Sequence, residues 1–227
     1  MTHVIAHRGA SRQAKENTIE AFQAAVACGA SGIEFDVRRT SDGVLVVHHD
    51  AIVNGRSIIS TPAAELPAWM PTFPAALDAC DGAFVNIEIK NSPGEPDFDE
   101  DDQVAAAVMV ELAARPDPPS RWLISSFRME TVDRCRAIDP EVPTAWLTWN
   151  PVTADVVTAV VAAGHAAIHP FAPHINEAVI DSCHEAGLRV NTWTCNDPEW
   201  ARRMASWGID GICTDVPDVI IEAVSGA

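Results

Sequence analysis

Acidic residues alternate with apolar ones in two short segments, a spacing that places the charged side chains on one face of a β-strand. Residues 32–37 (GIEFDV) carry Glu34 and Asp36, and residues 83–89 (AFVNIEI) carry Glu88. Three converging carboxylates repel one another unless a cation lies between them, and ligands that are all oxygen favour Mg²⁺ or Ca²⁺ over zinc. The pattern therefore predicts one divalent cation, Mg²⁺ or Ca²⁺, bound by Glu34, Asp36 and Glu88.

A second interpretation is open for these carboxylates. They could be solvated at strand ends or paired with arginine and lysine side chains, as a single Glu-x-Asp motif usually is. Two such strands that end at the same mouth of a barrel, where active sites of that fold lie, favour the metal site. Lys90 shares the strand face of Asn86 and Glu88, so its ammonium should point to the same place.

Histidines end two of the apolar runs. Residues 4–10 (VIAHRGA) lead into His7 and Arg8, and residues 44–50 (VLVVHHD) end in the adjacent pair His48 and His49. Because the ordinary pKa of histidine is near 6.5, two strand-terminal histidines indicate a general acid and a general base. His3, His165 and His184 are expected to be structural. His169 and His174 are expected to be either structural or at the rim of a substrate site.

The composition limits the class of protein. The 227 residues are 48% hydrophobic and carry a formal net charge of -17, which argues against a nucleic-acid or anionic-membrane partner. Six cysteines occur singly, at positions 28, 80, 135, 183, 195 and 213, and are interpreted as reduced core residues. No apolar run approaches a membrane span of ~20 residues, and no signal peptide is apparent. We expect a soluble cytoplasmic protein and leave its oligomeric state unassigned.

Short strand-like runs alternate with seven helix-like runs, and glycines at 29, 164 and 187 are expected to be C-terminal caps. About eight β/α units predict a TIM (β/α)8 barrel, in one domain over residues 1–227, with an open doubly wound sheet as the alternative. Ser41-Asp42-Gly43 predicts a hairpin that adds an antiparallel strand to the second unit. Residues 92–102 are expected to be only a solvated acidic surface. The predicted strands are residues 3–7, 32–37, 44–48, 83–89, 122–127, 143–148, 166–171, 189–194 and 210–214.

Seven motifs follow one another along the chain: HRGA (7–10), ENT (16–18), EFDVRRTSDGVLVVHHD (34–50), NIEIK (86–90), SSF (125–127), NTWTCN (191–196) and GIDGICTD (208–215). In this order they resemble the glycerophosphodiester phosphodiesterase family over essentially the whole chain. The combination of HRG, E-x-D and a T-x-DG hairpin ending in HD is specific, whereas SSF or DG alone would be weak.

The resemblance implies a TIM barrel that hydrolyses small glycerophosphodiesters to glycerol phosphate and an alcohol. The T-x-DG spacing selects His49 rather than His48 as a family catalytic residue. By role, the resemblance implies catalytic His7 and His49; metal ligands Glu34, Asp36 and Glu88, with Glu16 of ENT often reaching the site; phosphate contacts from Arg8 and Lys90; and Trp193 as a lining of the substrate pocket.

The chain departs from the family pattern after the HD pair. Where the family commonly carries a small inserted subdomain, this chain has a reduced insertion of about residues 50–72, beginning DAIVNGRSIIS. Lys15 also precedes ENT, where a proline is frequent. The first departure bears on the choice of alcohol, because the insertion overhangs the pocket.

Two other functions stay open. A lysophospholipase D-type enzyme would keep the same catalytic residues and use the apolar residues 66–73 (LPAWMPTF) to meet an acyl chain. A barrel that only binds phosphorylated ligands would belong to another class. It would not need an acid–base pair, so the two histidines argue against it.

Overall fold

The computed structural model describes residues 1–80 and 82–226, and in these ranges the main sheet has nine strands. Eight are parallel: β1 (His3–His7), β2 (Gly32–Arg39), β6 (Phe84–Ile89), β7 (Trp122–Ser126), β8 (Thr144–Thr148), β9 (Ala167–Pro170), β10 (Arg189–Thr192) and β11 (Gly211–Thr214). Because β1 pairs with both β11 and β2, these strands close into a barrel. The predicted TIM barrel is confirmed, and the open sheet is wrong.

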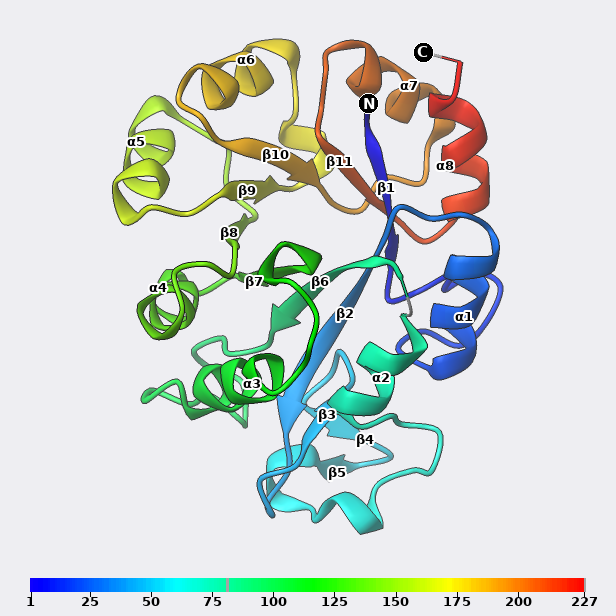
Figure 1. Ribbon diagram of the computed structural model, residues 1–227, viewed down its shortest axis with the longest axis vertical. Helices are drawn as coiled ribbons and strands as arrows, with labels where there is room; N and C mark the ends of the chain where they lie inside the picture. Colours follow the sequence, from blue (N-terminus) through cyan, green and yellow to red (C-terminus); the bar gives the residue numbers. More distant parts are fainter. Residues whose placement is uncertain (81, 227) are drawn as a thin grey trace.

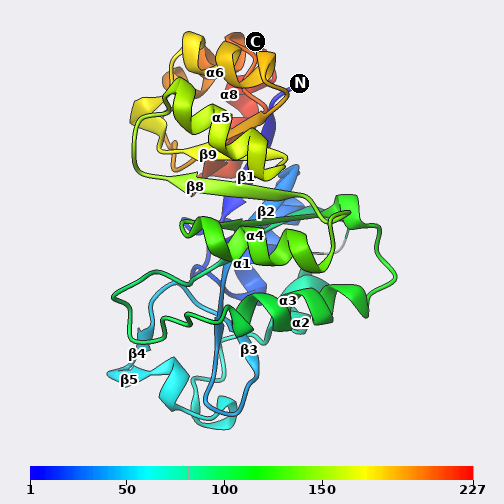
Figure 2. The same ribbon diagram turned by 90° about the vertical axis from the view of Figure 1, so that its left-hand side faces the viewer.

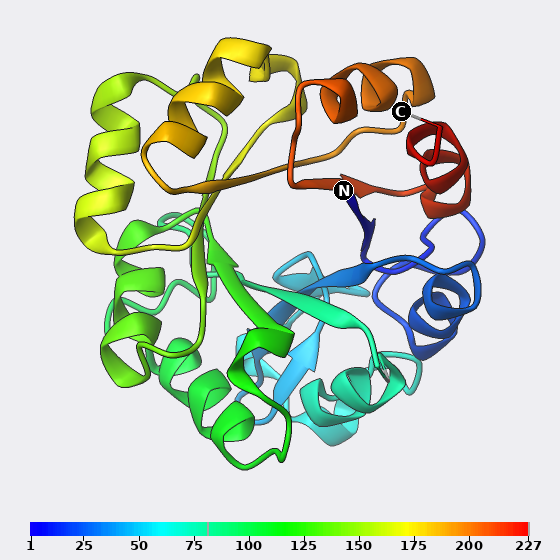
Figure 3. The ribbon, with the colours of Figure 1, turned by 45° about the horizontal axis from the view of Figure 1, so that its top comes forward.

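Helices form an outer ring around the strands, as Figure 3 shows. Thr18 caps α1 by accepting a hydrogen bond from the Ala21 N–H, and Gly164, at φ 80°, ends α5 as predicted. The α-helices of the described ranges are α1 (Ile19–Ala27), α2 (Phe73–Ala79), α3 (Gln103–Ala113), α4 (Met129–Ile138), α5 (Ala154–Ala163), α6 (Glu177–Glu185), α7 (Pro198–Ser206) and α8 (Pro217–Val224), with short 3-10 helices η3 (Pro119–Arg121) and η4 (Ala172–His174).

The outward face of β2 packs against the helices. Phe35 contacts Phe22 of α1 and Phe73 of α2, with 5.4 and 6.0 Å between ring centroids, and all three side chains are fully buried. Burial of one such side chain contributes ~1.5–3 kcal/mol. Because neighbours alternate along a strand, this packing turns Glu34 and Asp36 toward the barrel interior.

The strand register places the predicted site residues at two adjacent levels of the barrel interior. His7 is opposite Glu34 across the β1–β2 pair, and Glu34 and Asp36 are opposite Asn86 and Glu88 across the β2–β6 pair. His7 is the last residue of β1 and Glu88 is the next to last of β6, so the cluster faces the carboxyl-terminal end of the barrel, where TIM-barrel enzymes carry their active sites.

The hairpin at Ser41–Gly43 is present, and it leads into a small excursion from the barrel. The antiparallel strand β3 (Leu45–Val47) pairs with β2, and β4 (Ile52–Val53) pairs with β5 (Arg56–Ser57). The short helices η1 (Ile58–Ser60) and η2 (Ala63–Glu65) follow. Figures 1 and 2 show this segment extending from one end of the molecule. It buries its own cluster, Val46, Val53, Ile58 and Met70, against which Leu66 and Trp69 pack.

The acidic segment 92–102 is more than a solvated surface, so that prediction is wrong. Glu95 and Asp97 form ion pairs with the fully buried guanidinium of Arg38, and Asp102 pairs with Arg128. The carboxylates hold the β6–α3 connection against the barrel instead of facing water.

Within residues 1–80 and 82–226, no helix has both the length and the apolar character that crossing a membrane requires.

Candidate active site

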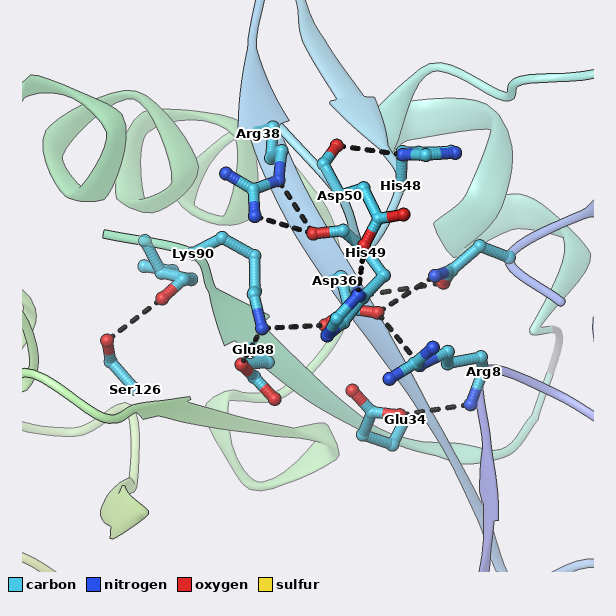
Figure 4. Close-up of polar contacts among 12 residues, drawn as sticks. Arg8, Glu34, Asp36, Arg38, His48, His49, Asp50, Glu88, Lys90 and Ser126 are labelled. Atoms are coloured by element: carbon cyan, nitrogen blue, oxygen red, sulfur yellow. Dashed lines mark hydrogen bonds and ion pairs between the residues drawn. The ribbon is translucent and has the colours of Figure 1, made fainter. Parts of the chain in front are cut away.

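Glu34, Asp36 and Glu88 meet inside the mouth of the barrel. Each offers a carboxylate oxygen within 4.8 Å of those offered by the other two, and all three residues are buried. Figure 4 shows these carboxylates pointing toward one another, with Arg8 and Lys90 entering from opposite sides. The alternation of apolar and acidic residues in β2 and β6 therefore places all three predicted metal ligands in one cluster.

Asp36 is the carboxylate with the most polar partners. It accepts a hydrogen bond from the Asn17 amide at 2.8 Å, and its oxygens lie 3.3 Å from Arg8 Nε and 3.6 Å from Lys90 Nζ. Burial alone would raise its pKa, but the positive charges of Lys90 and Arg8 outweigh it and lower the pKa to about 2. Asp36 is therefore an anion at neutral pH.

The pKa of Glu34 is shifted in the opposite direction. Burial and the neighbouring Asp36 charge raise its pKa to about 8. Oε2 accepts the backbone N–H of Arg8 at 3.0 Å, but Oε1 is buried without a hydrogen-bond partner among the described residues, and so is Oδ1 of Asn86. Unpartnered buried oxygens beside two further carboxylates match the donor set of a hard divalent cation.

Lys90 and Arg8 only partly balance the cluster. Lys90 Nζ donates to Glu88 Oε1 at 2.8 Å, and burial, which lowers its pKa, is outweighed by Glu88 and Asp36, so the pKa is raised. Arg8 also donates to Glu16 at 3.0 and 3.1 Å. The pairing with arginine and lysine that the sequence left open thus exists, but these two cations pair with the side chains of Asp36 and Glu88 and leave Glu34 without a cationic side chain of its own.

Glu16, which the resemblance brought near the metal, lies outside the carboxylate cluster. Its side chain is 48% exposed and pairs with the guanidinium of Arg8. In this arrangement it orients Arg8 from the solvent side.

His7 forms a histidine–aspartate pair at the end of β1. Its Nδ1–H donates to Asp215 at 2.7 Å, which leaves Nε2 facing Glu34, 4.0 Å away. Burial lowers the pKa of His7, but the Asp215 hydrogen bond and the Glu34 charge raise it above the ordinary value. Ser11 and Asn196 also donate to Asp215, at 3.2 and 2.7 Å, and its pKa falls to about 2 because the His7 hydrogen bond outweighs burial.

Asp215 was not among the residues predicted from the sequence. It follows β11 directly, in the motif GIDGICTD, and a carboxylate just beyond the last barrel strand was the signal that could have found it. Asn17, in ENT, was also not among the predicted residues, although its amide donates to Asp36.

His49 and His48 point to different places after β3. His49 lines the mouth together with His7, and its Nδ1–H donates to Asp50 at 2.7 Å. His48 donates to the Asp50 carbonyl and lies against Trp69, 5.8 Å between ring centroids. Figure 4 shows His48 turned away from the carboxylates, because neighbouring residues of an extended segment point to opposite sides.

An open hollow of about 1090 Å³ lies above the cluster, lined by His7, Arg8, His49, Glu88 and Lys90. Its opposite wall is aromatic: Phe127, Trp149, Phe171 and Trp193. Each of the four immediately follows a strand, β7, β8, β9 and β10 in turn. Their rings are in contact, with 4.4 Å between the centroids of Trp149 and Trp193. The sequence prediction named Trp193 and missed the other three.

His169 lies deeper, in the interior of the barrel below the mouth. It accepts a hydrogen bond from the Asn191 amide at 2.9 Å, and burial lowers its pKa to about 3. The backbone carbonyl of His169 accepts from Trp193 Nε1 at 2.8 Å. His169 is thus a neutral residue under the aromatic wall, and His174 lies at the rim, 6.0 Å from the Phe171 ring.

The arrangement has the parts that phosphoryl chemistry needs. The carboxylates could hold a cation, Arg8 and Lys90 could bind an anionic group, and two histidines with carboxylate partners could transfer protons.

Several known proteins with the same fold and related sequence are phosphodiesterases. The profile of the Glycerophosphoryl diester phosphodiesterase family matches residues 7–219. The glycerophosphodiester phosphodiesterase of Caldanaerobacter subterraneus subsp. tengcongensis is 30% identical, over 98% of this chain and 98% of its own. An Oleispira antarctica phosphodiesterase, solved with the product sn-glycerol-3-phosphate, has a TM-score of 0.89 at 25% identity, over 99% of this chain and 97% of that one. A Thermotoga maritima glycerophosphodiester phosphodiesterase has a TM-score of 0.82 at 27% identity, with 98% of each chain covered.

Proposed function

Because the chain belongs to the glycerophosphoryl diester phosphodiesterase family, a family of phosphoric diester hydrolases, we propose that it cleaves glycerophosphodiesters by cation-assisted acid–base catalysis. The observation that carries the proposal is one hollow lined by His7, His49, Arg8 and Lys90 above three converging carboxylates. Glu34, Asp36 and Glu88 would hold one Mg²⁺ or Ca²⁺, and Glu16 would act on Arg8 rather than on the cation.

A bound cation would neutralise phosphate charge and polarise the phosphorus centre. Arg8 and Lys90 would stabilise the negative charge that develops on the equatorial oxygens. One of His7 and His49 would take the proton of the nucleophile, and the other would return a proton to the leaving alkoxide. Asp215 and Asp50, bonded to Nδ1 of the two rings, would each leave Nε2 free for that transfer.

The substrate proposed is a small glycerophosphodiester. The product complex of the Oleispira relative is consistent with glycerol phosphate as the product here. Trp193 and its aromatic neighbours would lie beside the phosphate and accommodate the remainder of the diester.

A lysophospholipid substrate has weaker support. The apolar stretch 66–73 would meet the acyl chain, but Met70 is buried in the core of the excursion and Leu66 and Trp69 pack against it. Lys15 covers Trp69, with its ammonium 3.0 Å from a ring centroid. That stretch stabilises the rim instead of presenting a free apolar surface.

A non-catalytic phosphate-binding barrel has the least support, because binding alone does not require histidines with carboxylate partners. A cytoplasmic location is proposed from the cysteines, all six of which are free thiols in the described ranges. The net charge of -17 still disfavours nucleic acid as a partner.

A release assay separates the three functions. The purified protein is incubated with glycerophosphocholine or lysophosphatidylcholine, with and without Mg²⁺ or Ca²⁺, and free choline and glycerol phosphate are measured. The proposal expects cation-dependent turnover of glycerophosphocholine. Preferred turnover of lysophosphatidylcholine would favour the lysophospholipase D-type function. Binding of glycerophosphocholine without turnover would favour the non-catalytic barrel.

A further inference from the structure

Arg38 is a fully buried arginine at the end of β2, on the same strand face as Glu34 and Asp36. Its guanidinium donates from Nε and Nη2 to the backbone carbonyl of His49, at 2.8 and 2.5 Å. The same group pairs with Glu95 at 3.1 and 3.2 Å and with Asp97 at 2.5 Å. Figure 4 shows the guanidinium of Arg38 directed at the carbonyl of His49.

His49 lies outside the sheet, because β3 ends at Val47. One backbone hydrogen bond, from His48 N–H to the Asp36 carbonyl at 3.0 Å, continues the alignment with β2. Beyond it, the two bonds from Arg38 hold the His49 carbonyl. A planar, always charged guanidinium can bond this carbonyl and two carboxylates together, which an ammonium cannot do with the same geometry.

We infer that Arg38 is a positioning residue that fixes the backbone of His49, so that the imidazole faces the mouth, while Glu95 and Asp97 hold Arg38 in place. The inference rests on the proposed catalytic role of His49. It also assigns a function to the acidic segment 92–102, which would hold Arg38 in position. Glu95 of this segment lines the mouth and pairs with Arg38 at the same time.

A purely structural role for Arg38 predicts something different. The ion pairs could serve only to dock the β6–α3 connection, in which case their loss would lower stability and leave catalysis by the folded protein unchanged. Arg39 provides a matched control, because it is the next residue and pairs with the same acidic segment. It contacts Asp99 at 3.7 Å and Gln103 at 3.0 Å but has no contact with His49 among the described residues.

The test is a double-mutant cycle on glycerophosphocholine hydrolysis at saturating cation. Arg38→Gln is combined with Asp97→Asn, so that no buried carboxylate is left without its cation, and the pair is made with and without His49→Ala. Arg38→Lys, which keeps a positive charge beside Asp97, serves as a second variant that is more conservative for folding. Arg39→Gln is the control, Asp97→Asn alone measures the effect of the second substitution, and thermal unfolding verifies that each protein is folded.

With His49 present, we expect kcat to fall about 10- to 100-fold, the loss typical of a displaced catalytic group, with KM and cation affinity within about twofold. Arg38→Lys should recover part of kcat. With His49→Ala, the Arg38 change should have no further effect beyond about twofold, because residues that act through one another are not additive.

An equal fall in kcat in both backgrounds would overturn the inference, and so would an unchanged kcat in the folded Arg38 variants. If His49→Ala itself retained wild-type turnover, the proposed function of His49 would fail first, and the inference with it. The two failures are therefore distinguishable from the His49→Ala protein alone.

Discussion

Two carboxyl groups of the mouth, those of Asp36 and Glu34, are both buried but differ in ionisation. Asp36 is held ionised by Arg8 and Lys90, whereas Glu34, with an unpartnered oxygen and an anionic neighbour, has its pKa raised to about 8. A cation would supply the positive charge that Glu34 lacks. At the proposed cation site, binding would therefore be coupled to deprotonation of Glu34.

The first prediction follows from that coupling. Because Glu34 is protonated below a pKa of about 8 and must be ionised to bind a cation, Mg²⁺ or Ca²⁺ affinity should rise as pH increases from 6 to 8. Up to one proton should be released on binding near pH 7. Calorimetry in buffers of different ionisation enthalpy measures this release, and Glu34→Gln should abolish it and weaken binding while preserving the fold. A pH-independent affinity in the wild-type protein would contradict the prediction.

A second prediction concerns the His7–Asp215 pair. The pKa of His7 is raised above 6.5 in the folded protein, so the pair stabilises the fold fully below pH 6.5 and loses this effect as pH rises through the raised pKa. The lowered pKa of Asp215, about 2, means that its contribution is present above pH 3.8 and is lost toward pH 2. Asp215→Asn should therefore destabilise the cation-free protein most between about pH 4 and 6.5.

Urea unfolding of the two proteins in EDTA across pH 3–9 measures that difference. Asp215→Asn should also lower kcat by about 10-fold or more, because His7 loses the partner that sets its tautomer. The control is Asp210→Asn, which removes the partner of His184 away from the mouth and should leave kcat unchanged. If the stability difference between the two proteins grew above pH 8, the predicted direction of the pH dependence would be wrong.

Strands position most of the site, and connections complete it. The spacing of β2 and β6 predicts their carboxylates because residues two apart in a strand share a face. The segments after the strands obey no such period. For this reason the alternation could not predict that Asp215 bonds His7, that residues 92–102 bind Arg38, or that three further aromatic side chains join Trp193.

The end of β3 carries the third prediction. His49→Ala should lower kcat by about 100-fold or more, because His49 lines the mouth, whereas His48→Ala should change kcat little and lower stability through lost packing on Trp69. Steady-state kinetics on glycerophosphocholine and thermal unfolding of both variants separate the two effects. The opposite pattern would mean that His48, not His49, acts in the reaction.

At the scale of the whole molecule, the barrel could be predicted from the sequence because the β/α alternation continues through the chain. All nine strand-like runs overlap observed strands, whereas β4 and β5, within residues 50–72, were not predicted. The details of that excursion depend on packing around Ile58 and Met70, which no local pattern specifies. The expectation of a single domain over residues 1–227 stays a prediction.

Thermal unfolding tests that expectation together with cation binding. One domain should unfold in one transition, and a cation at about 100 times its Kd should add ~2.7 kcal/mol to the free energy of unfolding because it binds the folded state. Differential scanning calorimetry with EDTA and with Mg²⁺ or Ca²⁺ measures both, and Glu88→Gln should reduce the gain. Two separate transitions, of which the cation shifts one, would contradict a single domain.

The most direct measurement is glycerophosphocholine hydrolysis by the cation-depleted protein titrated with Mg²⁺ or Ca²⁺. We expect no turnover in EDTA, recovery that follows the cation affinity measured by calorimetry, and saturation at one cation per chain. Glu34→Gln should need more cation, and His49→Ala should bind cation normally yet stay nearly inactive. Full turnover in EDTA by a protein shown to be free of metal would contradict cation-assisted catalysis at the Glu34, Asp36 and Glu88 site.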